Sequence, residues 1–172
     1  MSNNTATPPK QLQDLTDEEI AKFAINFLVS GKSLGDLRGL TRDDLDGLYG
    51  VGHTHYSAGN YPQAEVTFHA LCLFDHRELR NWLAWGAACQ MQGKLESALN
   101  AYSFGQMMDL QSPEPAFHAF ECHVALQNFP EAVCALETVI ANCQGKKEHE
   151  ALEKKAKTLL TELQSALRQA GA

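Results

Sequence analysis

Apolar residues recur along this chain with the three- and four-residue spacing of helices, and one part of the pattern repeats at a fixed interval. Each copy carries a flexible turn, then an aromatic residue or leucine, and an alanine three residues later. The copies read AGNYPQA (58–64), QGKLESA (92–98) and LQNFPEA (126–132), and they start 34 residues apart. Antiparallel helix pairs that stack on copies of themselves have this period. The pattern therefore predicts an all-α chain built from tandem helix pairs.

A 34-residue period is typical of the tetratricopeptide repeat, whose template runs Trp-x-x-Leu-Gly-x-x-Tyr and then Ala-x-x-x-Phe. The second copy reads Trp82-x-x-Trp85-Gly86-x-x-Cys89, then Ala98-x-x-x-Tyr102. In the first copy Gly52 takes the glycine position, whereas the third copy has Phe120 there. A glycine lacks a Cβ and lets a second helix approach closely. We expect three tetratricopeptide repeats in a right-handed superhelical stack, over about 45–78, 79–112 and 113–146.

The same pattern sets the boundaries of the elements. We expect helix pairs near 42–58 with 61–74, 79–92 with 95–109, and 114–127 with 130–142. Residues 15–31 form an amphipathic pattern that predicts a flanking helix capped by Thr16 and Glu19, and an apolar stripe over 147–169 predicts a C-terminal capping helix. Residues 1–15 are expected to be a disordered tail, and 16–172 a single domain.

Charge and composition limit the range of possible functions. The net charge is −7, which disfavours binding to a nucleic-acid backbone, and no apolar run approaches the ~18 residues of a membrane span. The first residues have no apolar core and do not read as a signal peptide. We therefore expect a cytoplasmic protein with no membrane association, and five reduced cysteines.

Candidate chemistry is weak. The sequence GKS at 31–33 lacks the earlier glycine of a phosphate-binding loop, because position 26 is Asn26. His53 and His55 are two residues apart and diverge on a helix, whereas a zinc pair on one helix face needs a spacing of four. His118 and Glu121 could share a face but have no third partner. We expect no catalytic residues, no metal, no cofactor and no enzymatic activity.

The first helix of each pair should face the concave side of the stack. Repeat positions 2, 5, 9, 12 and 13 lie on that face, and from them we predict a peptide-binding groove. Its residues are Tyr49, His53, Tyr56, Arg80, Leu83, Ala87, Gln90, Met91, Phe117, Glu121 and Val124. Tyr49, His53 and Tyr56 fall on one helical stripe. A stripe of core residues is the alternative interpretation, which the spacing does not exclude.

Two segments carry a more specific resemblance. FHALCLFDH (68–76) and YSFGQMMDLQSPEPAFHAFECHVAL (102–126) are similar to the class II chaperones of bacterial type III secretion systems, the SycD/LcrH type. Phe74-Asp75, the Gly105…Met108-Asp109 segment and the Phe117-His118-Ala119…Glu121-Cys122 segment are not required by generic repeat packing. The resemblance runs from about residue 16 to the end of the chain.

That resemblance implies a cytoplasmic chaperone for hydrophobic translocator proteins. It would bind an extended translocator segment in the groove and keep the client soluble and unassembled before export. Some members of the family also assist a transcriptional activator. The resemblance leads us to expect an aromatic residue at position 53, and His53 departs from that expectation. We further expect a homodimer formed through the N-terminal helix.

Two other functions compete with this interpretation. A repeat that captures a C-terminal carboxylate needs Lys or Arg along its groove, and only Arg80 stands among the predicted positions. The second alternative is a tetratricopeptide-repeat scaffold or regulatory adaptor of a secretion system without a translocator client. The sequence does not separate that alternative from the chaperone.

Overall fold

The computed structural model describes Thr16, Lys22 and residues 30–170. The chain divides into two compact units, Met1–Lys32 and Ser33–Ala172. The disordered tail expected over 1–15 and most of the helix expected over 15–31 lie outside the described residues. The fold is therefore described for the second unit alone.

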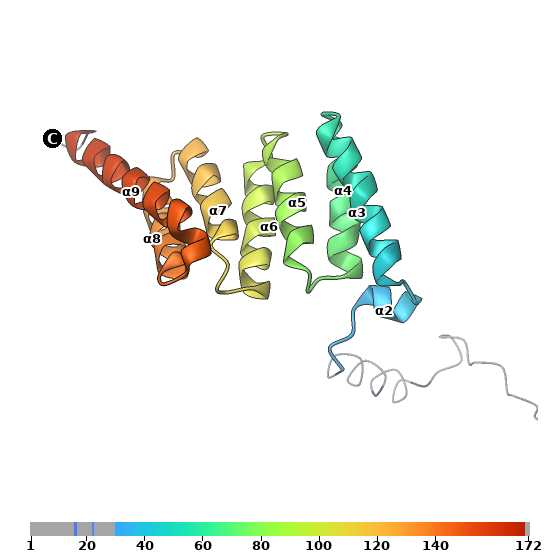
Figure 1. Ribbon diagram of the computed structural model, residues 1–172. Coiled ribbons are helices and arrows are strands. Elements are labelled where there is room, and N and C mark those ends of the chain that lie inside the picture. The colour runs from blue at the N-terminus through green and yellow to red at the C-terminus, as the bar shows by residue number, and fades with distance from the viewer. Residues whose placement is uncertain (1–15, 17–21, 23–29, 171–172) are drawn as a thin grey trace, which may run out of the picture. The chain divides into compact units, whose positions relative to one another are not determined.

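Over residues 33–170 every regular element is helical, as the repeat pattern predicts. The elements are α2 (Leu34–Arg38), α3 (Arg42–Ser57), α4 (Tyr61–Phe74), α5 (Leu79–Gln90), α6 (Leu95–Met108), α7 (Glu114–Ala125), α8 (Phe129–Cys143), the 3₁₀ turn η2 (Lys147–His149) and α9 (Glu150–Ala170). Figure 1 shows α3 to α8 following one another as three helix pairs, with α9 beside α8 at the C-terminal end. The all-α fold of three tandem repeats is thus confirmed.

The helix boundaries follow from local chemistry. Thr41 caps α3: its hydroxyl accepts from the Asp44 backbone N–H at 3.2 Å, and the Asp44 carboxylate accepts from the Thr41 N–H at 2.9 Å. The first helix of each pair ends where the backbone enters the left-handed region. Gly59 and Gly93 adopt φ of 76° and 72°, and Gln127 adopts 59° at the equivalent place of the third pair. The turn is therefore conserved between repeats even where glycine is replaced.

The short helix α2 was not expected from the sequence. Ser33 and Asp36 form a reciprocal cap at its start, with the Ser33 N–H donating to the Asp36 carboxylate at 2.7 Å. Gly35 then lies against the C-terminal end of α4, where a Cβ would stand 2.9 Å from the carbonyl oxygen of Phe74. Segment 33–38 therefore turns beside α4, and a Ser-x-x-Asp spacing is its sequence signal.

Each of the first two pairs is held by an aromatic ring packed on a glycine. A Cβ on Gly52 would lie 2.6 Å from the ring of Phe68, and a Cβ on Gly86 would overlap the ring of Tyr102. In both pairs the ring lies directly on the glycine. In the third pair the sizes are exchanged, because the buried Phe120 stands at the glycine position and Leu136 at the ring position.

The C-terminal helix covers the last repeat. Ala156 of α9 is fully buried with Leu136 and Val139 of α8, and Leu152, Leu159, Leu160 and Leu163 pack around the same cluster. These leucines belong to the apolar stripe that predicted the helix. The stack therefore ends in a helix that is apolar on its inner side and polar on its outer side.

Candidate functional site

A groove runs along α3, α5 and the start of α7, and it encloses a cavity of about 520 Å³. The lining residues are Tyr49, His53, Tyr56, Phe68, Glu78, Leu79, Arg80, Leu83, Ala84, Ala87, Glu114 and His118. Six of the eleven predicted groove residues are among them: Tyr49, His53, Tyr56, Arg80, Leu83 and Ala87. The first helices of three successive repeats therefore contribute to one cavity. We call it the groove.

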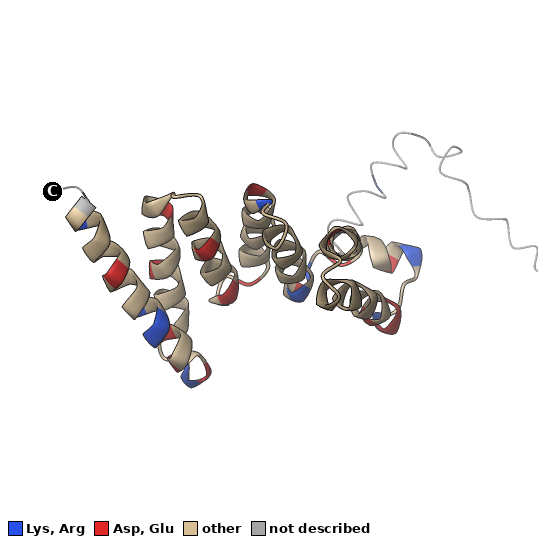
Figure 2. Ribbon diagram, turned by 90° about the horizontal axis from the view of Figure 1, so that it is seen from above, with Lys and Arg blue, Asp and Glu red and all other residues tan. Residues whose placement is uncertain are grey.

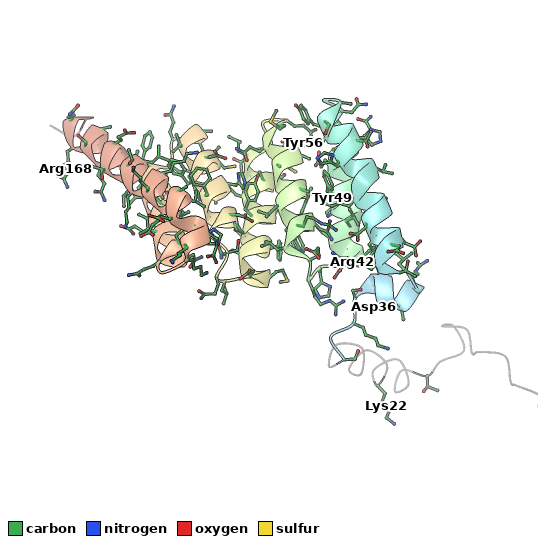
Figure 3. The ribbon with its side chains drawn as sticks, in the orientation of Figure 1. Lys22, Asp36, Arg42, Tyr49, Tyr56 and Arg168 are labelled. Carbon is green, nitrogen blue, oxygen red and sulfur yellow. The ribbon has the colours of Figure 1, made fainter. Side chains whose placement is uncertain are left out.

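The stripe on α3 belongs both to the groove and to the core. The Tyr49 ring packs at 5.3 Å from the ring of Phe68, and the Tyr56 ring meets Tyr61 edge-on at 5.4 Å. Both tyrosines are half-buried, whereas His53 is exposed between them. Both lie on the side of α3 that faces α5 (Figure 3). Part of each tyrosine ring is thus used in packing, and both residues also line the groove.

The single arginine of the groove is already engaged. Arg80 donates to the Asp46 carboxylate and lies over the Tyr49 ring, with its guanidinium carbon 4.1 Å from the ring centroid. The hydrogen bond from Arg80 lowers the pKa of Asp46 below its ordinary value. A guanidinium with a carboxylate partner is poorly available to a peptide C-terminus. The geometry therefore disfavours carboxylate capture, as the shortage of cations in the sequence suggested.

Acidic residues at the start of α5 are held by a second arginine. Arg42 donates to Glu78 at 2.8 Å, and its guanidinium lies 3.7 Å from the Asp75 carboxylate. Burial alone would raise the pKa of Glu78, but the hydrogen bond and charge of Arg42 outweigh it and lower that pKa. The Glu78 carboxylate is therefore charged where it borders the groove.

A chain of polar contacts fixes the far end of the groove. The Tyr102 hydroxyl donates to Gln90 Oε1 at 2.8 Å, and Gln90 Nε2 donates to Glu121 at 3.4 Å. His118 Nδ1 lies 3.1 Å from the same carboxylate, and the His118 ring stacks on Tyr102 at 5.3 Å between centroids. Burial raises the pKa of Tyr102, so its hydroxyl stays a donor. Gln90 and Glu121, both predicted groove residues, are thus fixed beside the cavity rather than in its lining.

Three predicted groove residues lie elsewhere. Met91 and Val124 are 51% and 38% exposed at the C-terminal ends of α5 and α7. Phe117 belongs to the core cluster with Leu136 and is covered by Lys155 of α9, whose Nζ lies 4.5 Å from the ring centroid. The helix α9 packs on the last repeat in place of a fourth repeat, and it covers Phe117.

The groove also contains residues that the repeat positions did not select. Ala84 lies four residues after Arg80, and His118 lies three residues before Glu121, so each continues a stripe along its helix. Glu78 and Leu79 enter at the start of α5. Spacings of three and four residues from the selected positions would have found Ala84 and His118. Phe68 lines the cavity from α4, and no spacing from the selected positions would have found it.

Other kinds of site are not found in the described part of the chain. Within it, no group of three or more His, Cys, Asp or Glu side chains is arranged to hold a metal ion. None of its helices combines the length and apolarity needed to cross a bilayer. Its Lys and Arg residues are spread over several helices and loops rather than gathered on one face (Figure 2).

Comparison with known proteins agrees with this architecture. The tetratricopeptide repeat family matches residues 45–77 and 81–105. The low calcium response locus protein H of Yersinia pestis is 34% identical over 125 residues, which cover 72% of this chain and 74% of that protein. An alternative dimer of SycD, a type III secretion translocator chaperone of Yersinia enterocolitica, has a TM-score of 0.69 at 30% identity and covers 73% of this chain and 96% of SycD.

The chain belongs to the type III secretion translocator chaperones. A further member of this chaperone family, PcrH of Pseudomonas aeruginosa, has been solved in complex with the chaperone binding region of PopD. That structure has a TM-score of 0.71 at 37% identity and covers 74% of this chain and 96% of PcrH. Members of the family are chaperones, and this chaperone is not an enzyme.

Proposed function

We propose that this chaperone binds an extended segment of hydrophobic type III translocator proteins in the groove and keeps them soluble and unassembled before export. One observation carries the proposal. This chain is similar to PcrH, which binds a region of PopD. It has a preformed cavity of about 520 Å³ between the first helices of its repeats. The cavity combines aromatic and aliphatic side chains with charged ones at its border, as peptide grooves do.

The groove is suited to an extended chain rather than to a folded one. Tyr49 and Tyr56 line the groove from α3, and Leu83 and Ala87 line it from α5. Apolar surface therefore borders the groove on two opposite sides. Successive side chains of an extended peptide point to opposite sides and would meet these two surfaces in turn. Binding removes the client from the aggregating pool by mass action, and this needs no nucleotide.

The same proposal extends to location and self-association. We infer that the protein acts in the cytoplasm, where clients wait for export, and that it forms a homodimer. Support for the dimer comes from SycD, which has been solved as dimers. The helix expected over 15–31 is the segment that we propose for this contact. Size-exclusion chromatography with light scattering, with and without residues 1–30, tests it: loss of the dimer on truncation is expected, and an unchanged dimer contradicts it.

Co-expression with a translocator from the same bacterium tests the chaperone function directly. The translocator should be insoluble when expressed alone and should be recovered as a soluble complex with this chain. Val66→Glu is the control variant, because Val66 is 71% exposed on α4 and does not line the groove. This variant should keep the translocator soluble as the wild-type chain does. If both translocators of the system stay insoluble beside the wild-type chain, the scaffold or adaptor alternative is favoured instead.

A further inference from the structure

A second cavity, of about 400 Å³, lies between α6 and α8 over α7. Ser103 and Gln106 line it from α6, Ala116, Ala119 and His123 from α7, and Thr138 from α8. The helix α7 therefore contributes to two cavities with different residues, because Glu114 and His118 face the groove. This second cavity has no part in the peptide binding proposed above.

The preceding repeat shows what normally fills this space. The positions 34 residues earlier than Ala116, Ala119 and Thr138 are Trp82, Trp85 and Phe104. There the indole of Trp82 stacks on Phe104 with 5.0 Å between ring centroids, and Trp85 packs on His69 of α4 at 4.4 Å. The space between α4 and α6 is thus filled by aromatic rings that the chain itself supplies.

Around the second cavity all of these rings are replaced by small side chains. Ala116, Ala119 and Thr138 take the places of the two tryptophans and the phenylalanine, and Ser103 takes the place of His69. The helices nevertheless keep the arrangement of the preceding pair, with α6 and α8 packed on α7. The cavity therefore has room for the ring that the neighbouring repeat provides internally.

The same exchange introduces polar atoms into the cavity wall. Gln106 and His123 stand 34 residues after Cys72 and Cys89, whose thiols are buried. The amide of Gln106 donates to the carbonyls of Asp109 at 3.0 Å and Ser112 at 3.2 Å. Its buried Oε1, and the buried Nδ1 of His123, have no hydrogen-bond partner among the described residues. Both atoms are buried away from the cavity surface, so the other atoms of these two side chains form its wall.

We propose that the second cavity receives a tryptophan side chain of a partner polypeptide. The indole supplies the aromatic volume that Trp82 and Trp85 supply in the preceding repeat, and that Ala116 and Ala119 leave empty here. A polypeptide is favoured over a small molecule because exposed apolar surface continues beyond the cavity. Met107, one helical turn beyond Ser103 on α6, is 60% exposed.

Cys134 allows the proposal to be tested on the unaltered protein. It lines the cavity and is the exposed one of the five cysteines. Burial raises the pKa of Cys89 to about 12 and that of Cys122 to about 11, so these thiols are unreactive near neutral pH. The rate at which a maleimide labels Cys134 is therefore a measure of how far the cavity is occupied.

The experiment compares acetyl-Gly-Trp-Gly-amide, acetyl-Gly-Leu-Gly-amide and free indole as protecting agents. The tryptophan peptide should slow labelling about threefold at twice its Kd, and the leucine peptide should slow it far less at the same concentration. Equal protection by both peptides, or none by the tryptophan peptide, overturns the proposal. Protection by indole alone also overturns it, because the occupant would then be a small molecule.

A variant that fills the cavity provides the second measurement. Ala119→Trp restores the residue of the preceding repeat, so it should abolish binding of a 5-fluorotryptophan peptide followed by fluorine NMR. Ala141→Trp, on the exposed side of α8, is the matched control and should bind as wild type does. Retained binding by a folded Ala119→Trp overturns the proposal. If that variant does not fold, the protection of Cys134 in the wild-type chain still decides it.

Discussion

The ring of Tyr102 lies directly on Gly86, so closely that a Cβ at position 86 would overlap it. Tyr102 is 1% exposed, and its hydroxyl is hydrogen-bonded to Gln90 at 2.8 Å, so the ring cannot move aside easily. One glycine thus sets both the approach of α5 and α6 and the position of Gln90 beside the groove. The repeat motif therefore connects packing with the binding surface.

Gly86→Ala should lower the free energy of unfolding by about 1–2 kcal/mol. Overpacking costs about 1–3 kcal/mol, and the better helix propensity of alanine returns up to about 1 kcal/mol. Urea unfolding followed by circular dichroism measures the change. Gly47→Ala is the matched control, because Gly47 lies within α3 with no atom near its absent Cβ, and it should be neutral or stabilising. Equal stabilisation by both substitutions would contradict the assigned contact.

Gln127→Gly should raise the free energy of unfolding by about 1 kcal/mol. Gln127 has a φ of 59°, a region that costs non-glycine residues about 1 kcal/mol or more, whereas the other two repeats have glycine there. Asn128→Gly serves as control because Asn128 has a φ of −85°, and it should not stabilise the fold. The prediction is wrong if thermal melts rank the two variants in the opposite order.

The contribution of Glu65 to the free energy of unfolding should depend on pH. Burial would raise its pKa, but the hydrogen bonds from Lys94 at 2.6 Å and Gln92 at 2.7 Å outweigh burial and lower it. A carboxyl whose pKa is lower in the folded state stabilises the protein above its unfolded pKa of about 4.3, and this contribution disappears as the pH falls through the folded pKa.

The stability difference between wild type and Glu65→Gln should therefore be full at pH 7 and should vanish at acidic pH. We expect at most about 1 kcal/mol, because the Lys94 side chain is 49% exposed. Glu96→Gln, on the first turn of α6 next to Lys94, is the control, since no ion pair of Glu96 is found among the described residues. Urea melts between pH 3 and pH 7 give the comparison, and a constant difference across this range would contradict the assignment.

The repeat architecture was predictable because one period fixed the helices, their pairing and the glycine contacts of the first two pairs. The groove was predictable where repeat neighbours are equivalent, as for Tyr49 and Leu83. Phe117 shows why the rest was not: it stands at a groove position of the repeat, but α9 replaces the next repeat and covers it. The helix α2 was missed because its five residues are too few to show a periodicity.

Replacing Tyr49 and Tyr56 together with alanine should weaken translocator binding strongly. Aromatic anchors commonly contribute about 2 kcal/mol each, so the affinity should fall by roughly a thousandfold if the losses add. The variant should also lose stability, because the Tyr49 ring packs against Phe68 and against the Arg80 guanidinium. Calorimetric titration and circular dichroism of the same samples separate the two effects. Unchanged affinity in a folded variant would move the site away from α3.

The central claim, that the groove itself holds the client segment, is tested most directly by filling the groove without removing any contact. Ala87→Trp places a bulky ring in the cavity, whereas Val66→Trp places the same ring on the 71% exposed position of α4. Calorimetric titration would use the chaperone binding region of PopD and the corresponding region of a translocator from the same bacterium. We predict binding to wild type and to Val66→Trp, and at least about tenfold weaker binding to Ala87→Trp, or about 1.4 kcal/mol. Equal affinity of all three proteins for the client segment would contradict the account.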